Sequence, residues 1–237
     1  MSRLFHCKQF SISDEDCGMK IGTDAVLLGA WTDTTDCKSI LDIGTGSGIL
    51  ALMLAQKSTA QINAIEIDTL AAKTAENNFL KSNWKSRLQI FNLSLDNFIK
   101  SNSKTYDLII SNPPFFKNSL LSEDVTKNIA KHDVSLTYEE LIRAASFLLN
   151  PTGKLSVILP YDKKEIFSDI CKFHNLKCFK ITTVIPVTNK KPNRILMQWL
   201  KTGNPINCIE NTLTIRLSND IYTADYIGLT KDYLLNS

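Results

Sequence analysis

The fold is decided by the stretch SILDIGTGSGILALMLAQK, which runs from residue 39 to residue 57. Its first part, Ser39 to Ile43, is an apolar run of strand length, and Ile49 to Lys57 has the length and spacing of a helix. Between them lie three alternate glycines, Gly44, Gly46 and Gly48. Glycines at such a corner let backbone N–H groups approach a ligand closely. The stretch therefore predicts a strand, a glycine turn that binds a ligand, and a helix.

Apolar runs and amphipathic segments alternate through the rest of the chain. Further strands are predicted at Ile62 to Ile67, Leu88 to Phe91, Tyr106 to Ile110 and Leu155 to Leu159, and further helices at Leu70 to Lys81 and Tyr138 to Leu149. Such alternation implies an α/β protein with a parallel sheet. Late in the chain, strand-like runs follow one another without helices, at Phe179 to Val187, Ile195 to Leu200 and Thr212 to Leu217. They indicate antiparallel pairing at the end of a mostly parallel sheet.

Composition fits one globular domain. The 237 residues are 43% hydrophobic and 22% charged, close to ordinary globular usage, and no linker-like stretch divides them. We expect one domain over 1–237, with an N-terminal arm and helix at 1–37, a core at 38–200 and a C-terminal extension at 201–237. The apolar run Ile49 to Ala55 is too short to span a bilayer, and the N-terminus lacks the pattern of a secretory signal. A cytoplasmic protein is expected.

The cysteines predict neither a metal site nor a disulfide framework. They are scattered, without a C-x-x-C pair or a histidine at finger-like spacing. The six are Cys7, Cys17, Cys37, Cys171, Cys178 and Cys208. Buried reduced thiols are the better interpretation in a cytoplasmic chain of this size.

The acidic residues beside the glycine turn indicate which ligand it binds. A dinucleotide fingerprint needs its third glycine one place later, where Ile49 stands, and no G-K-[ST] follows. Asp42, two places before the first glycine, would repel phosphate and favour a cationic ligand such as S-adenosylmethionine. Glu66 ends the next strand about 20 residues on, where acids bind ribose hydroxyls, and Asp68 suits the N-cap of the following helix. A purely structural strand–helix corner is the alternative.

Asn112-Pro113-Pro114-Phe115 follows the predicted strand Tyr106 to Ile110 and fits a site that holds an amino group. The exocyclic amine of a base is a poor nucleophile, so an enzyme must orient it with acceptors. The side-chain carbonyl of Asn112 and the backbone carbonyl of Pro113 supply two, and the two prolines fix the turn. Phe115, and Phe116 after it, would stack on the base. The alternative is an Asn-Pro turn followed by a core phenylalanine.

Position favours the functional interpretation of both motifs. The carboxyl ends of parallel strands form one crevice, so Asp42, Glu66 and Asn112 are expected to converge on a single pair of ligands. The three histidines, His6, His132 and His174, form no Ser-His-Asp or Cys-His constellation, which disfavours nucleophilic hydrolysis.

The two motifs together resemble those of class I S-adenosylmethionine-dependent methyltransferases that act on amino groups. The segments Gly18 to Trp31 and Tyr226 to Leu234 are similar to those of the bacterial tRNA1(Val) adenine N6-methyltransferase family, which makes the resemblance nearly full-length. It implies a Rossmann-like fold, with a mostly parallel seven-stranded sheet, a C-terminal antiparallel hairpin and helices on both faces. It also implies methylation of the adenine immediately 3′ of the anticodon.

The same resemblance implies the roles of individual residues. Asp42, the three glycines and Glu66 would hold the cofactor, and Asn112 to Phe115 the target adenine. Thr23 and Asp24 would close over the methionine end, although Asp24 could simply cap a helix. Ser94 stands where such enzymes often carry an acid that binds the cofactor's adenine, with Asn92 and Asp96 nearby, so this contact stays open.

The substrate is the least determined part of the sequence-based hypothesis. Residues 161–237 hold 11 Lys and Arg against 7 Asp and Glu, and this basic third would face tRNA through Lys163, Lys164, Lys190, Lys191 and Arg194. Asn-Pro-Pro also occurs in methyltransferases of ribosomal RNA guanine N2 and of protein glutamine. These two substrates, a small molecule and a non-catalytic RNA-binding domain remain alternatives, and a DNA adenine methyltransferase ranks last among the enzymes.

Overall fold

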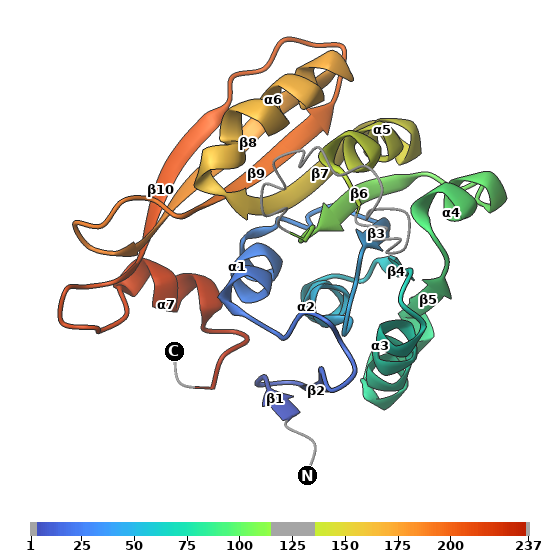
Figure 1. Cartoon of the computed structure of the whole chain (residues 1–237), viewed down its shortest axis with the longest axis horizontal. Helices are drawn as coiled ribbons and strands as arrows, with labels where there is room; N and C mark the ends of the chain where they lie inside the picture. The colour runs from blue at the N-terminus through green and yellow to red at the C-terminus, as the bar shows by residue number, and fades with distance from the viewer. Residues whose placement is uncertain (1–3, 115–135, 236–237) are drawn as a thin grey trace, which may run out of the picture.

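The computed structural model describes residues 4–114 and 136–235. Eight strands within these residues form one sheet, in the order β10-β8-β9-β7-β6-β3-β4-β5 (Figure 1). The strands are β3 (Ser39–Ile43), β4 (Gln61–Glu66), β5 (Leu88–Asn92), β6 (Tyr106–Ser111), β7 (Leu149–Pro160), β8 (Leu176–Val187), β9 (Arg194–Lys201) and β10 (Ile209–Arg216). From β5 to β7 neighbouring strands are parallel, and β9 is antiparallel to both β7 and β8. The expected α/β fold and the β8–β9 hairpin are confirmed.

The strand count and the place of the last strand differ from expectation. The sheet has eight strands, as the apolar runs predict, rather than the seven that the resemblance implies, because Ile209–Arg216 joins it as an edge strand. This strand, β10, pairs in parallel with β8 and not as a further antiparallel hairpin. The connection from β9 therefore crosses to the outer side of β8, which a pattern of successive apolar runs does not reveal.

Helices cover both faces of the sheet, as Figure 1 shows. One face carries α1 (Thr23–Trp31), α2 (Ile49–Lys57), α3 (Thr69–Lys81) and α7 (Ala224–Thr230), and the other carries α4 (Leu95–Ser101), α5 (Tyr138–Leu148) and α6 (Lys164–Phe173). Successive strand residues point to opposite faces, so Ile40 joins one buried cluster and Leu41 the other. Because both faces of the central sheet are buried, β6 and β7 carry runs of consecutive apolar residues rather than alternating ones.

The helices begin at residues that supply N-caps or open a turn. Asp68 accepts a hydrogen bond from the Ala71 amide (2.8 Å), which confirms it as the N-cap of α3. Thr137 and Glu140 form a capping box at the start of α5. Helix α2 starts after Gly48, whose φ of 87° lies in the left-handed region. Each predicted helix lies within one residue of its observed bounds.

The two ends of the described chain meet beside α2. Strands β1 (Leu4–His6) and β2 (Ser11–Ser13) form a small hairpin, and Cys7 bridges to Leu234. The Lys8 amide donates to the carbonyl of Tyr233 (2.8 Å), and the Tyr233 hydroxyl donates to the carbonyl of Met53 in α2 (3.3 Å). No described helix is long and apolar enough to cross a membrane.

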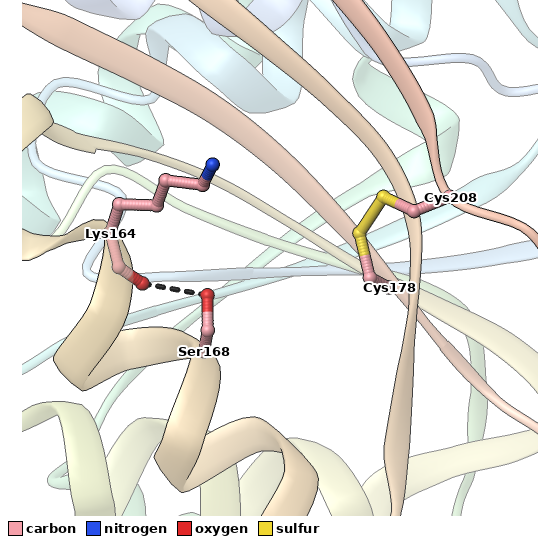
Figure 2. The surroundings of a disulfide bond; sticks show 4 residues. All are labelled: Lys164, Ser168, Cys178 and Cys208. Atoms are coloured by element: carbon pink, nitrogen blue, oxygen red, sulfur yellow. Dashed lines mark hydrogen bonds between the residues drawn. A yellow bond between two sulfur atoms is a disulfide. The ribbon is translucent and has the colours of Figure 1, made fainter.

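Two cysteines depart from the predicted reduced state. Cys178 and Cys208 are joined by a disulfide near the start of β8, which Figure 2 shows beside the Lys164–Ser168 hydrogen bond of α6. Their Cα atoms lie 5.3 Å apart although 30 residues separate them in sequence. The parallel pairing of β10 with β8, which sets Ile209 opposite Lys180, brings them together. Among the described residues the other four cysteines are free and buried.

Candidate functional site

The carboxyl ends of β3, β4 and β6 lie side by side, because β3 pairs with β6 on one side and β4 on the other. A cavity of about 300 Å³, here called the inner cavity, opens at this edge. Its walls come from the glycine turn, the end of β4, the Asn-Pro-Pro segment and the loop that precedes α1. They include Gly44 to Ser47, Glu66 to Asp68, Asn112 to Pro114 and Cys17 to Ile21.

The glycine turn is anchored to β4 by its own amides. The amides of Gly44 and Thr45 both donate to the carbonyl of Ile65 (3.0 Å each). The Gly46 amide donates to Oε2 of Glu66 (2.9 Å). Phosphate-binding loops direct such free N–H groups at the ligand, whereas here three of them are consumed within the protein. The turn is therefore built for a ligand other than a phosphate chain.

The three glycines meet different surroundings. All have positive φ, 72° at Gly44, 55° at Gly46 and 87° at Gly48, in the region that favours glycine. A Cβ on Gly44 or Gly46 would meet no protein atom within 4 Å, so these two open toward the cavity. A Cβ on Gly48 would lie 2.5 Å from the Phe79 ring. Gly48 therefore allows α2 and α3 to pack, a role the glycine spacing alone does not distinguish.

Asp42 lies behind the turn rather than in the inner cavity. Its side chain is fully buried, and Oδ2 accepts a hydrogen bond from the Thr45 hydroxyl (2.5 Å). Burial raises the pKa of this carboxyl to about 7. The sequence places Asp42 against the cofactor, but the residues that line the cavity do not include it. The geometry gives it the task of holding Thr45 and the turn.

Glu66 stands where the inner cavity continues into a neighbouring cavity of about 260 Å³. Its Oε1 accepts from the Asp68 amide (2.9 Å), and with Oε2 on Gly46 the carboxylate is fixed at the centre of the site. Each oxygen retains a lone pair for a hydroxyl donor.

The neighbouring cavity contains Ser94 and Asp96 at the start of α4. Ser94 is the N-cap of this helix and accepts from the Asn97 amide (3.3 Å). Asn92 is occupied elsewhere, because its amide group donates to the carbonyls of Glu66 (2.9 Å) and Ile67 (3.2 Å). Of the three polar residues left open by the sequence, Ser94 and Asp96 can face a ligand here, and Asn92 fixes the end of β4.

Asn112 carries an unsatisfied acceptor at the wall of the inner cavity. Its Oδ1 is buried and has no hydrogen-bond partner. The neighbouring Ser111 hydroxyl donates to the carbonyl of Ile43 (2.8 Å), which fixes the Asn-Pro-Pro segment against the glycine turn. An unpaired buried acceptor costs about 1–3 kcal/mol, so the site lacks a donor that a ligand would supply. Phe115, Phe116 and His132 lie outside the described residues.

Thr23 and Asp24 do not border the inner cavity. Both begin α1 and line a separate outer cavity, and Oδ2 of Asp24 accepts from Nε of Arg194 (2.8 Å). Asp24 is not the N-cap of α1, which is Gly22. The resemblance that places these two residues at the methionine end is thus not matched by their position.

The loop before α1 closes the inner cavity, and sequence reasoning did not predict this wall. Cys17, Met19 and Ile21 contribute to it. Asp14 holds the loop by accepting from the Ile21 amide (2.9 Å). Asn78 of α3 ties the adjoining arm to the glycine turn, since its amide group donates to the carbonyls of Ser13 and Ser47 (2.8 Å each). The one signal of this contact in the sequence was Asn78 itself, a polar residue on the apolar face of the amphipathic helix α3.

Known proteins share both the sequence and this architecture. The family model described as "Methyltransferase small domain" matches residues 16–181. The tRNA1(Val) (adenine(37)-N6)-methyltransferase of Parabacteroides distasonis is 38% identical over 98% of this chain and 97% of its own length. The protein of the same name from Trichodesmium erythraeum is 41% identical, again over 98% and 97%. The chain belongs to the tRNA1(Val) (adenine(37)-N6)-methyltransferase family.

The protein of the same name from Haemophilus influenzae is 38% identical over 98% of both chains. Solved structures share the fold. A predicted O-methyltransferase, Atu636 from Agrobacterium tumefaciens, superposes with a TM-score of 0.70 at 18% identity, covering 89% of this chain and 96% of that one. In the part of the chain that the structure describes, no three His, Cys, Asp or Glu side chains are grouped to hold a metal ion.

Proposed function

We propose that this methyltransferase uses S-adenosylmethionine to methylate N6 of adenine 37, the base next to the anticodon, in valine tRNA. Family membership over nearly the full length supports the reaction. The observation that carries the proposal is the unpaired, buried side-chain oxygen of Asn112 at the wall of the inner cavity. The exocyclic amino group of adenine is the donor that this oxygen lacks.

The residues of the inner cavity fit the cofactor. S-adenosylmethionine supplies a methyl group made electrophilic by its cationic sulfur. Gly44 and Gly46 leave open space where a ligand can lie against the backbone. Glu66 accepts hydrogen bonds from the ribose hydroxyls of the cofactor. Ser94 or Asp96, in the adjoining cavity, accepts one from the amino group of the cofactor's adenine. Asp42 supports this surface indirectly, through Thr45 and the turn.

Asn112 and Pro113 act on the substrate by orientation. Two acceptors, the Asn112 side-chain carbonyl and the Pro113 backbone carbonyl, take the two hydrogens of the amino group and turn its lone pair toward the methyl group. Pro114 stiffens the turn. With S-adenosylmethionine bound, N6 would receive the methyl group as the C–S bond breaks, and the methylated nitrogen would lose to water one of the two protons held by the Asn112 and Pro113 carbonyls. Stacking of the base on Phe115 stays a prediction.

The proposed partner is valine tRNA, and the proposed location is the cytoplasm. A basic C-terminal third supports tRNA as the partner over a protein glutamine, and the anticodon arm of valine tRNA follows from the relatives' names. A protein that acts on tRNA is expected in the cytoplasm. Thr23 and Asp24 would then serve the substrate side of the site, given the cavity that they line.

Replacement of Asn112 by alanine tests the proposal. Single-turnover methyl transfer to an unmodified valine tRNA transcript is expected to fall by at least about 100-fold, because the amino group loses its orienting acceptor. Cofactor affinity, measured by calorimetry, should be unchanged, since glycine turn and Glu66 are intact. Asn211→Ala, at an exposed asparagine of β10, is the matched control and should transfer methyl groups normally.

The two readouts separate the role of Asn112 from a general defect. Equal loss of cofactor affinity and methyl transfer in Asn112→Ala would show that the residue serves the cofactor or the fold. Full activity of the variant would remove Asn112 from the reaction altogether.

A further inference from the structure

Asn112 borders two cavities. The second is the outer cavity, of about 630 Å³, whose lining does not include the glycine turn or Glu66. It is formed by the start of α1, the carboxyl end of β8, the start of β9, the end of β10 and the segment that leads into α7. Its polar lining includes Thr23, Asp24, Asn193, Arg194, Arg216 and Tyr222. A substrate that reaches Asn112 from outside the cofactor site passes through this space.

Basic residues far apart in sequence converge at this edge of the sheet. Arg194 starts β9 opposite Pro160, where β7 ends, and Arg216 ends β10 opposite Val187, where β8 ends. The turn between β8 and β9 adds exposed Lys190 and Lys191. The topology therefore places Arg194 and Arg216 in one cavity with Asn112.

Three groups on two residues fix the guanidinium of Arg216. Its Nη1 donates to Oδ1 of Asp220 (2.6 Å), and its Nη2 donates to the Tyr222 hydroxyl (2.8 Å). The guanidinium carbon lies 4.5 Å from the centre of the Tyr222 ring, in cation–π contact. Tyr222 is stacked in turn on Tyr226 of α7, with ring centres 4.7 Å apart. Arg194 is held similarly by Asp24 (2.8 Å).

We infer that the outer cavity is the RNA-docking groove, in which Arg194 and Arg216 bind backbone phosphates on either side of the target nucleotide. This inference rests on the proposed function. A planar guanidinium presents five N–H donors, so Arg216 keeps donors beyond those given to Asp220 and Tyr222. Phosphate can share or replace Asp24 and Asp220, and Tyr222 positions Arg216 for it. A single-stranded loop fits, because its target base can leave the stack and enter the turn.

RNA fits this groove better than a protein partner does. The core of a protein–protein interface is depleted of charged residues, whereas charged side chains from three separate elements meet here. Pairs of arginine and phosphate supply affinity that falls with salt, which gives the inference a physical signature.

Substitutions at the Arg216–Asp220 pair test the inference, because docking and structural roles predict opposite signs. Arg216→Gln should raise the dissociation constant for valine tRNA by on the order of 10-fold. It should also reduce the slope of log K against log salt by about 0.7–0.9, the loss of one phosphate contact. Asp220→Asn removes the competing carboxylate, so it should tighten binding. Lys177→Gln is the matched control. This exposed lysine lies at the amino end of β8, away from the outer cavity, so its replacement should change neither quantity.

The position of Tyr222 adds a second pair of variants. Tyr222→Phe keeps the ring under Arg216 and should stay within about 3-fold of the wild-type dissociation constant, whereas Tyr222→Ala should approach Arg216→Gln. Cofactor affinity should be unchanged in every variant. If Arg216→Gln and Asp220→Asn weaken binding alike, or the salt slope does not change, the groove is not the docking site. That result leaves the proposed function intact, whereas a wild-type protein that methylates no tRNA removes both.

Discussion

At the scale of single residues, the three glycines of the turn look alike in the sequence but have different structural roles. Gly44 and Gly46 open toward the inner cavity, whereas Gly48 makes room for Phe79. Asp42 and Glu66 divide similarly, since Asp42 is buried behind the turn and Glu66 lines the cavity. Residue types and spacing predicted which residues gather here. They did not predict which side of the turn each one faces, because that depends on packing against α3 and β4.

Alanine at Gly46 and at Gly48 should therefore fail in different ways. Gly46→Ala costs about 1–2 kcal/mol of stability for its left-handed backbone, and its methyl group fills ligand space, so cofactor affinity should fall at least about 10-fold. Gly48→Ala adds a clash with Phe79 to the same strain and should lose about 2–5 kcal/mol. Chemical denaturation and calorimetry measure the two effects.

A second substitution checks the assigned cause. Phe79→Leu introduced into Gly48→Ala should recover part of the lost stability, because it removes the ring atom that lies 2.5 Å from the new Cβ. Equal cofactor affinity in wild type and Gly46→Ala would contradict the assignment of that glycine to the ligand surface.

At the scale of elements, the regular core was predictable because its signals are local. Apolar runs bounded by polar turns gave β3 to β7 and the helices α2, α3 and α5. The parallel pairing of β10 with β8 and the Cys178–Cys208 link were missed, since both depend on the connection from β9, which crosses β8 before β10 pairs on its outer side. The outer cavity was missed for the same reason. It joins Asp24 to Arg194, residues whose neighbourhood no local pattern encodes.

The carboxyl end of α1 depends on one lysine from α2. Nζ of Lys57 donates to the carbonyls of Gly29 (2.6 Å) and Ala30 (3.1 Å) and also to that of Thr32. Lys57→Met should cost about 1–3 kcal/mol, because the last carbonyls of α1 lose their donor. Denaturant unfolding at neutral pH measures the loss, with the exposed Lys38→Met as control.

The same lysine should shape the pH dependence of stability. Burial lowers the pKa of Lys57 to about 8, so the folded protein releases this proton at lower pH than the unfolded chain does. Between about pH 8 and 10.5 the Lys57 side chain binds more protons in the unfolded state, so its own contribution to the free energy of unfolding should rise with pH. The buried thiols of Cys7, Cys17 and Cys37, whose pKa values burial raises, contribute with the opposite sign, so the Lys57 contribution is taken as the difference between wild type and Lys57→Met. Lys57→Met should remove that rise, and an unchanged profile would show that the ammonium is not desolvated there.

At the scale of the whole molecule, both ends of the chain serve the edge of the sheet where the carboxyl ends meet. The N-terminal arm, anchored by Asn78, closes the inner cavity, and the C-terminal strands build the outer one. Asn112 lies at the boundary of both. The methyl donor and its acceptor base can thus reach the same side chain, each from its own cavity. Both terminal parts of the chain therefore build walls of the candidate site.

Methyl transfer from labelled S-adenosylmethionine to three acceptors in parallel tests the proposed substrate of the enzyme. Unmodified tRNA, ribosomal RNA and a release factor represent the chemically related substrates, and nucleoside and amino-acid analysis identifies the product. We expect label in valine tRNA alone, recovered as N6-methyladenosine at position 37, the position in the relatives' name. Label confined to guanine N2 of ribosomal RNA or to a protein glutamine would contradict it.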